Sequence, residues 1–208
     1  WTNTAESVTD GSRIFIPGKR TPAGTFPIFK GVDVSWYKNC KYAVDAFIID
    51  CEEDFFGYYD YNTEQGLVQC ANHFIVPGKK RFTWGTSEDG LFWAPILSDK
   101  AIPYIELQSG RFRTQSIVEF IDPHFFEEWR EWWYPIAKID GISFANEDVA
   151  IHVKPKGRIS EAFIGVYATK ELSACRVIIR DGDRTWEEVV DMSPRNPFIK
   201  NYALRAKK

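Results

Sequence analysis

The residues best suited to chemistry lie in the middle of the sequence. His73 is one candidate, because imidazole gains and loses a proton near neutral pH and polar residues surround this histidine. Glu106 is its candidate partner. It stands between Ile105 and Leu107, where an acid is costly unless it is paired or useful. Together they predict acid–base catalysis, with His73 as the acid and Glu106 as the base. The alternative is that Glu106 takes the outward position of an alternating strand.

Aromatic rings and planar polar groups in the same region suit a sugar ligand. Aromatic residues make up 16% of the chain, and 8 of them are Trp. A sugar site needs rings that stack on C–H faces and polar groups that bind hydroxyls. The residues predicted to bind substrate are Trp36, Tyr37, Asp60, Trp84, Gln108 and Arg111. The structural alternative places Trp36, Trp84 and Trp93 in the core and uses Asp54 and Asp60 to cap turns.

Metal and cofactor chemistry have weaker support in the sequence. A third hypothesis is metal-assisted hydrolysis by Asp54, Asp60 and His73, since carboxylates and imidazole suit several divalent ions. The four cysteines show no C-x-x-C or Cys/His ligand spacing, so no zinc site is predicted, and both disulfides and free thiols stay open. Nucleotide-binding glycine loops, H-E-x-x-H and G-x-S-x-G do not occur, and no cofactor is predicted.

Composition excludes several classes of partner. The 208 residues carry a net charge of -3, which is not the basic footprint of a nucleic-acid binder. The sequence shows no apolar run long enough to cross a bilayer and no signal-peptide pattern, so no membrane partner is predicted and the compartment stays open.

The sequence predicts short β-strands as the elements that position these residues. Runs of β-branched and aromatic residues end at turn residues, as expected for an all-β, mainly antiparallel fold. The runs are 14–16, 47–49, 74–76, 104–107, 163–167 and 176–180. The last run, the turn 181–183 with Asp181-Gly182, and residues 185–190 predict a β-hairpin. A polar, turn-rich passage near residue 146 predicts a boundary between segments 1–145 and 146–208.

One segment conflicts with an all-β fold. Asp122 and Pro123 precede aromatic residues at helical spacing, which locally favours an amphipathic helix over residues 125–134. As a strand, the same segment would place Trp129, Glu131 and Trp133 on one face.

Several motifs, in order, cover nearly the whole chain. They are W-T-N at 1–3, G-V-D-V-S-W-Y-K-N from 31, E-D-F-F-G-Y-Y-D from 53, N-H-F-I-V-P-G-K-K-R-F-T-W-G from 72, P-Y-I-E-L-Q-S-G-R from 103 and W-W-Y-P-I from 132. With these motifs the chain resembles the family called domain of unknown function 5107, whose members are similar to galactose mutarotase-like β-supersandwiches. The resemblance implies that residues 1–145 form the C-terminal part of such a supersandwich, that an N-terminal part of it is absent, and that residues 146–208 form a small β-module. It also implies a strand, not a helix, before the W-Y-P turn.

The resemblance implies two classes of function. In mutarotase-like enzymes a His and a Glu act across the sugar ring, and His73 and Glu106 are the residues here that could do so. One expectation is therefore a carbohydrate-binding or carbohydrate-processing domain, of epimerase or glycosidase type, with a carbohydrate as its partner. The other is a non-catalytic module that positions an adjacent repeat domain of the same polypeptide for protein binding. Fold alone does not decide between them.

Overall fold

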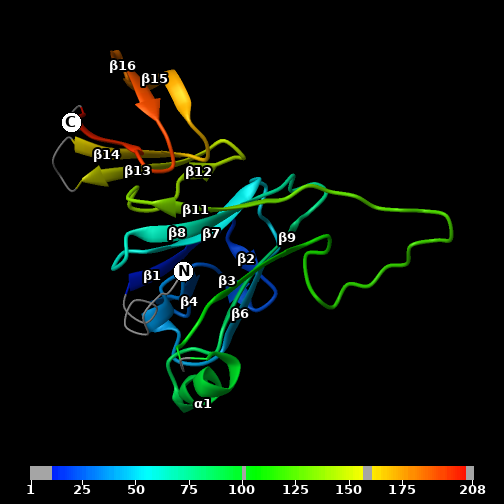
Figure 1. Ribbon diagram of the computed structural model, residues 1–208. Coiled ribbons are helices and arrows are strands. Elements are labelled where there is room, and N and C mark those ends of the chain that lie inside the picture. The colour runs from blue at the N-terminus through cyan, green and yellow to red at the C-terminus, as the bar shows by residue number, and fades with distance from the viewer. Residues whose placement is uncertain (1–10, 100–101, 157–160, 205–208) are drawn as a thin grey trace.

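The chain folds into four stacked layers of β-structure in a computed structural model that describes residues 11–99, 102–156 and 161–204 (Figure 1). Every pairing between its strands is antiparallel. The predicted all-β, mainly antiparallel class is therefore confirmed.

Two sheets are built mainly from the first two thirds of the chain. The middle sheet contains, in spatial order, β1 (Ser12–Phe15), β7 (Phe55–Asp60), β8 (Gln65–Cys70) and β11 (Trp132–Ala137). The outer sheet contains β10 (Glu106–Gly110), β9 (Gly78–Thr83) and β6 (Val44–Ile48). Two short pairs lie between β1 and β6 in the chain: β2 (Arg20–Thr21) with β3 (Gly24–Thr25), and β4 (Ile28–Phe29) with β5 (Val32–Asp33), followed by the 3₁₀ turn η2 (Tyr37–Asn39).

The other two layers come from the last third of the chain. The C-terminal sheet contains β12 (Phe144–Ala145), β13 (Val149–Lys156), β14 (Glu161–Ala168) and β17 (Phe198–Ala203). The hairpin of β15 (Leu172–Asp181) and β16 (Arg184–Met192) covers this sheet (Figure 1). The turn of the hairpin is made by Gly182 with a φ of 59°, a conformation that glycine adopts at little cost, and the predicted hairpin is confirmed.

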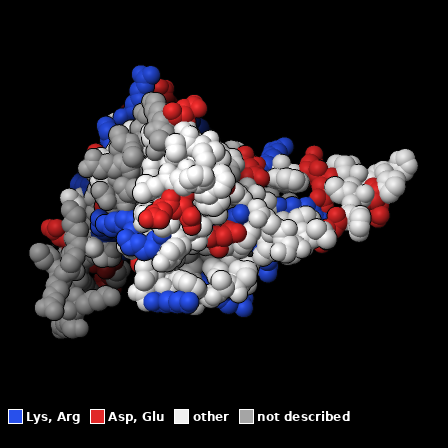
Figure 2. Space-filling view, turned by 90° about the horizontal axis from the view of Figure 1, so that it is seen from below, with Lys and Arg blue, Asp and Glu red and all other residues white. Residues whose placement is uncertain are grey.

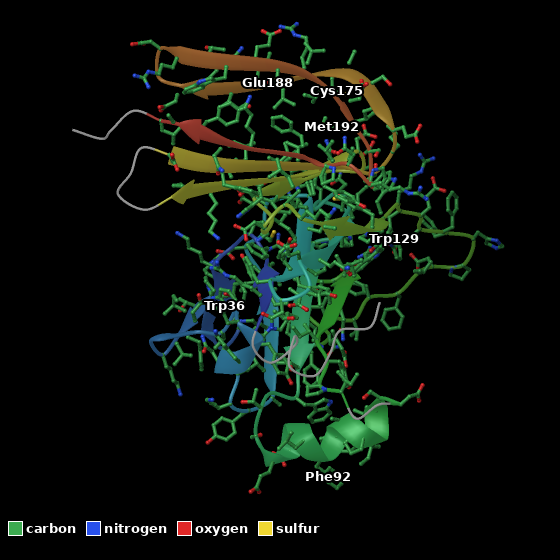
Figure 3. All side chains as sticks on the ribbon, turned by 60° about the vertical axis from the view of Figure 1, so that its left-hand side comes forward. Trp36, Phe92, Trp129, Cys175, Glu188 and Met192 are labelled. Carbon is green, nitrogen blue, oxygen red and sulfur yellow. The ribbon has the colours of Figure 1, made fainter. Side chains whose placement is uncertain are left out.

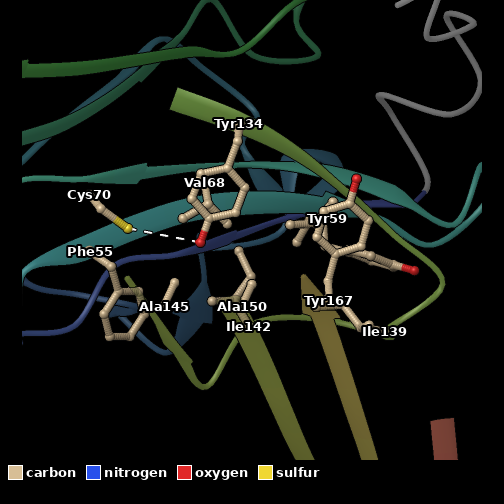
Figure 4. Close-up of a cluster of buried hydrophobic side chains, with 11 residues drawn as sticks. Phe55, Tyr59, Val68, Cys70, Tyr134, Ile139, Ile142, Ala145, Ala150 and Tyr167 are labelled. Carbon is tan, nitrogen blue, oxygen red and sulfur yellow. Dashed lines mark hydrogen bonds between the residues drawn. The ribbon is translucent and has the colours of Figure 1, made fainter. Parts of the chain in front are cut away.

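Strand alternation gives the middle sheet two apolar faces. Phe55 and Tyr59 of β7 point into the core shared with the C-terminal sheet, whereas Phe56, between them, points into the core shared with the outer sheet. The first of these cores joins β7, β8 and β11 to residues beyond 138, including Ile139 and Tyr167 (Figure 4). The middle sheet is thus buried on both sides, and the outer sheet closes one end of the stack.

Two local predictions are wrong. Residues 74–76 form a turn, because Asn72 accepts the backbone N–H of Phe74 through its side chain and those of Ile75 and Val76 through its carbonyl. Residues 125–131 are not helical, and β11 starts at Trp132. Extended backbone puts alternate side chains on one side, which lets the indole N–H groups of Trp129 and Trp133 both reach the Glu131 carboxylate, at 2.9 and 3.1 Å.

The α-helix α1 (Glu88–Leu97) is absent from the sequence-based prediction. Ser87 and the acids Glu88 and Asp89 are signals of a helix start, but Pro95 inside the segment argues against a helix. Within the described residues, no helix is long and apolar enough to cross a membrane. The four cysteines are free thiols.

A long connection, the arm (residues 111–131), leaves β10 and returns in β11. It projects from the body (Figure 1), and Figure 2 shows acidic residues among uncharged ones along it. Several large apolar side chains of the arm are exposed, and Phe120 is 97% exposed. At the root of the arm, Arg111 pairs with Glu119 at 3.1 Å and with Glu127.

Candidate functional site

The register of β9 with its two neighbours decides which side chains share the outer face of the outer sheet, the face that points away from the core. Residues directly opposite one another in a sheet lie on the same face. Two cross-strand rows face outward: Asp45–Phe82–Glu106 and Phe47–Lys80–Gln108. Gly78 and Gly110 form a third row without side chains. On the inner face Ala46, Ile48, Lys79 and Arg81 are all buried. On the outer face Lys80 is buried too, whereas the other side chains of the two rows keep some exposure.

The polar groups of the outer face are paired with one another. The Gln108 amide donates to a Glu106 oxygen at 2.6 Å, and Gln115 of the arm donates to the Gln108 carbonyl oxygen at 3.5 Å. The Lys80 ammonium lies 3.3 Å from an Asp45 oxygen, and 4.8 Å from the centre of the Phe47 ring. A carboxylate, an amide and an ion pair thus line the same patch and can bind adjacent hydroxyl groups.

A hollow of about 280 Å³ lies beside these rows, where the root of the arm crosses the sheet. Its walls include Phe47, Lys80, Gln108, Gly110, Arg111 and Gln115. A Cβ atom placed on Gly110 would meet nothing within 4 Å, so this glycine leaves open space. Gly78 has another reason to be glycine, because its Cβ would lie 2.1 Å from the Phe112 carbonyl oxygen of the arm.

At the other end of β9 the outer face continues as an aromatic ridge, defined by Phe82, Trp84, Trp93 and Phe92. Successive ring centres are 5.1, 5.1 and 5.4 Å apart. Trp84 is held by stacking on Trp93 of α1 and by a 3.1 Å hydrogen bond from its indole N–H to the Tyr104 hydroxyl. The ridge ends at Phe92, which is 62% exposed and points away from the body (Figure 3).

Four of the predicted site residues therefore lie along one face: Trp84, Glu106, Gln108 and Arg111. The sequence-based prediction missed Asp45, Phe47, Lys80 and Phe82. A lysine followed two residues later by an aromatic residue in β9 is a signal that these side chains share a face. Their position opposite Glu106 and Gln108 depends on a register that a single sequence does not reveal.

His73 lies apart from this face, in the turn between β8 and β9. Its Nδ1 is 2.7 Å from an Asp54 oxygen, which also accepts the backbone N–H of His73 at 2.8 Å. Burial raises the pKa of the Asp54 carboxyl, but these bonds from His73 outweigh burial and hold it below its usual value. Glu106 stands opposite Phe82, four residues beyond the first residue of β9, a distance of about 13 Å at about 3.3 Å per residue. The predicted acid–base pair of His73 and Glu106 is not brought together.

The remaining predicted substrate-binding residues also lie elsewhere. Trp36 stacks on Tyr61 with ring centres 5.3 Å apart, and Figure 3 places it away from both Phe92 and Trp129. Tyr37 is 1% exposed and donates its hydroxyl to the Gly85 carbonyl, so it is a core residue.

Asp60 has a structural role that also excludes the metal hypothesis. It is fully buried and accepts hydrogen bonds from the Asn62 backbone at 2.9 Å and the Thr63 hydroxyl at 3.0 Å, which caps the turn between β7 and β8. Asp54 precedes β7 and Asp60 ends it, so Asp54, Asp60 and His73 do not converge. In the described ranges, no cluster of three or more His, Cys, Asp or Glu could hold a metal ion.

Comparison with known proteins identifies the family of the chain. A solved structure, described as a TPR-domain containing protein from Parabacteroides distasonis, is 22% identical over 60% of this chain, with a TM-score of 0.49. The chain spans 22% of the length of that protein. A family model described as the second domain of YphG-like proteins matches residues 144–208. A second model, described as a domain of unknown function (DUF5107), matches residues 1–136, and the chain therefore belongs to the DUF5107 family.

Proposed function

We propose that the chain binds carbohydrate on the outer face of the outer sheet. The observation that carries the proposal is that four residues predicted from the sequence as catalytic or substrate-binding, Trp84, Glu106, Gln108 and Arg111, lie along this one face. They come from β10, the arm and the residue that follows β9.

The chemistry of the face suits hydroxyl-rich ligands. The Glu106 carboxylate accepts hydrogen bonds, the Gln108 amide both donates and accepts, and the Arg111 guanidinium donates. Rings beside these groups offer apolar faces for the C–H groups of a sugar. A concave pocket lined by apolar and aromatic side chains with a few placed polar groups is the usual form of a small-molecule site, and the hollow has this form.

Binding is better supported than catalysis. A general acid must lie within hydrogen-bond reach of the group that it protonates, and His73 is held by Asp54 at the opposite end of β9 from Glu106. The polar neighbour of Glu106 is Gln108, which does not transfer protons. We therefore propose a binding role for Glu106 and a structural role for the pair of His73 and Asp54.

The test is a titration of the protein with a panel of mono- and oligosaccharides, followed by tryptophan fluorescence, because Trp84 and Trp93 adjoin the site. Gly110→Leu should weaken binding by at least about tenfold, since its side chain fills open space in the hollow without a strained backbone. Glu106→Gln should weaken binding by about tenfold or more through the loss of a charged acceptor.

The matched control is Glu187→Gln, which removes an exposed carboxylate from the hairpin at the other end of the stack. It should bind like the parent. Saturable binding that survives both Gly110→Leu and Glu106→Gln would place the sugar elsewhere, and the absence of binding to every sugar would refute the proposal.

A second candidate, the module that positions adjacent repeats, is favoured by the exposed apolar side chains of the arm. Val118, Phe120 and Phe125 are 82%, 97% and 75% exposed, and such patches often mark protein interaction sites. If the arm packs against neighbouring repeats, its amides should exchange hydrogen more slowly in a polypeptide that carries those repeats than in this chain. Equal exchange in the two would argue against this role.

A further inference from the structure

We infer that the ligand of the outer face is a neutral oligosaccharide that spans several sugar units, not a monosaccharide. This inference rests on the proposed function and goes beyond it by naming the class of ligand. The hollow, the polar rows and the aromatic ridge form three successive contact areas along β9.

The distances exceed what one sugar ring can cover. The hollow is lined by Gly78 and Lys80, which precede Phe82, where the ridge begins, by four and two residues, or about 13 and about 7 Å at about 3.3 Å per residue. Beyond Phe82 the ridge continues through three further rings, each 5.1 to 5.4 Å from the one before. A single pyranose ring cannot contact both the hollow and Phe92, whereas a chain of such rings can.

Each area offers contacts of a different kind. At one end the hollow can enclose part of a terminal unit, because Gly110 leaves space there. In the middle Glu106 and Gln108 can bind hydroxyl groups. At the other end the ridge is an apolar aromatic surface that makes few polar contacts, and it ends at the exposed Phe92, whose ring can stack on a sugar face.

The charges on the face favour a neutral ligand. The cations that border it already have acidic partners: Lys80 is 3.3 Å from Asp45, and Arg111 pairs with Glu119 and Glu127. A ligand carboxylate or sulfate would have to compete with these acids and would also approach Glu106. Neutral hydroxyl groups can join the existing pairs without displacing either partner.

The experiment uses a glycan array of neutral and acidic mono- and oligosaccharides, followed by calorimetry on the tightest ligand shortened one unit at a time. We expect affinity to rise by at least about tenfold from the single sugar to the longest chain. Phe92→Ala should weaken the longest ligand by about three- to tenfold, the range of one aromatic contact, and leave the single sugar unchanged.

Leu91→Ala is the matched control, because Leu91 is 64% exposed on the same helix and lies outside the ridge. Thermal melting of each variant checks that α1 is intact. A single sugar that binds as tightly as the longest chain would overturn the inference and leave the proposed function standing, as would selective binding of acidic glycans. No binding to any glycan would refute the proposed function itself.

Discussion

At the scale of single residues, His152 is an imidazole enclosed between two layers of the stack. It is 8% exposed, and its ring contacts Phe15 of the middle sheet and Phe163 of the C-terminal sheet, with centres 6.2 and 6.4 Å apart. Gly141 packs against the ring so closely that a Cβ there would lie 2.8 Å from it. Burial lowers the pKa of His152 to about 4; Asp140 opposes this effect.

This histidine should make stability depend on pH. The unfolded chain binds the proton with a pKa near 6.5, whereas the folded protein binds it only near 4, so stability falls as pH drops from about 6.5 to about 4. The full loss is of the order of 3 kcal/mol. His152→Asn should remove this part of the pH dependence in urea unfolding at pH 7, 5.5 and 4.5. Equal slopes in the parent and the variant would mean that His152 is not excluded from protonation.

At the scale of elements, one carboxylate fixes the root of the arm against two sheets. Glu131 accepts hydrogen bonds from Gln69 of the middle sheet at 3.1 Å, from Ser109 of the outer sheet, and from the indoles of Trp129 and Trp133. Burial raises the pKa of Glu131. The four hydrogen bonds together lower it by more than burial raises it, so the pKa of this carboxyl is below its usual value. The C-terminal end of the arm is thus attached to Ser109, which lines the hollow.

Replacing this carboxylate should loosen the arm without unfolding the sheets. Glu131→Gln replaces one acceptor oxygen with an NH₂ group, which is a donor and cannot accept the hydrogen bonds that reach this position. We expect a loss of about 1–3 kcal/mol in unfolding free energy. Limited proteolysis should cut residues 112–130 faster than in the parent. Glu128→Gln, an exposed neighbour, is the control and should leave the cleavage rate unchanged. Unaltered cleavage in Glu131→Gln would show that other contacts hold the arm.

The segment around Glu131 shows which structural features can be predicted from the sequence and which cannot. The alternation that places Trp129, Glu131 and Trp133 on one face is visible in the sequence, but aromatic residues at helical spacing compete with it locally. The choice depends on Gln69 and Ser109, which are distant in sequence. The same holds for the outer face. The residue types of Glu106 and Gln108 indicate a polar site in the sequence, whereas the placement of Lys80 and Phe82 beside them depends on strand register. The sequence favours His73 as a catalytic acid because the side chain is polar and titratable. It does not show that Asp54 binds the imidazole.

At the scale of the whole molecule, one core joins the segments on both sides of residue 140. The Tyr134 hydroxyl donates to the Asn146 and Val149 carbonyls, at 2.7 and 3.1 Å, and lies 4.0 Å from the Cys70 thiol (Figure 4). Ile139 is fully buried in this core and packs tightly on Gly165, whose Cβ would lie 2.8 Å from it. The parts matched by two family models therefore share their interior.

A shared core should make the stack unfold as one unit. We expect calorimetry to give a single transition whose calorimetric and van 't Hoff enthalpies agree. Ile139→Ala should lower that one transition by about 2–5 kcal/mol in stability, because the cavity lies between layers and neither side can close it alone. If the layers were independent, the scan of this variant would show two peaks, only one of them shifted. The position of a core between sheets, and not the order of strands along the chain, sets the size of the cooperative unit.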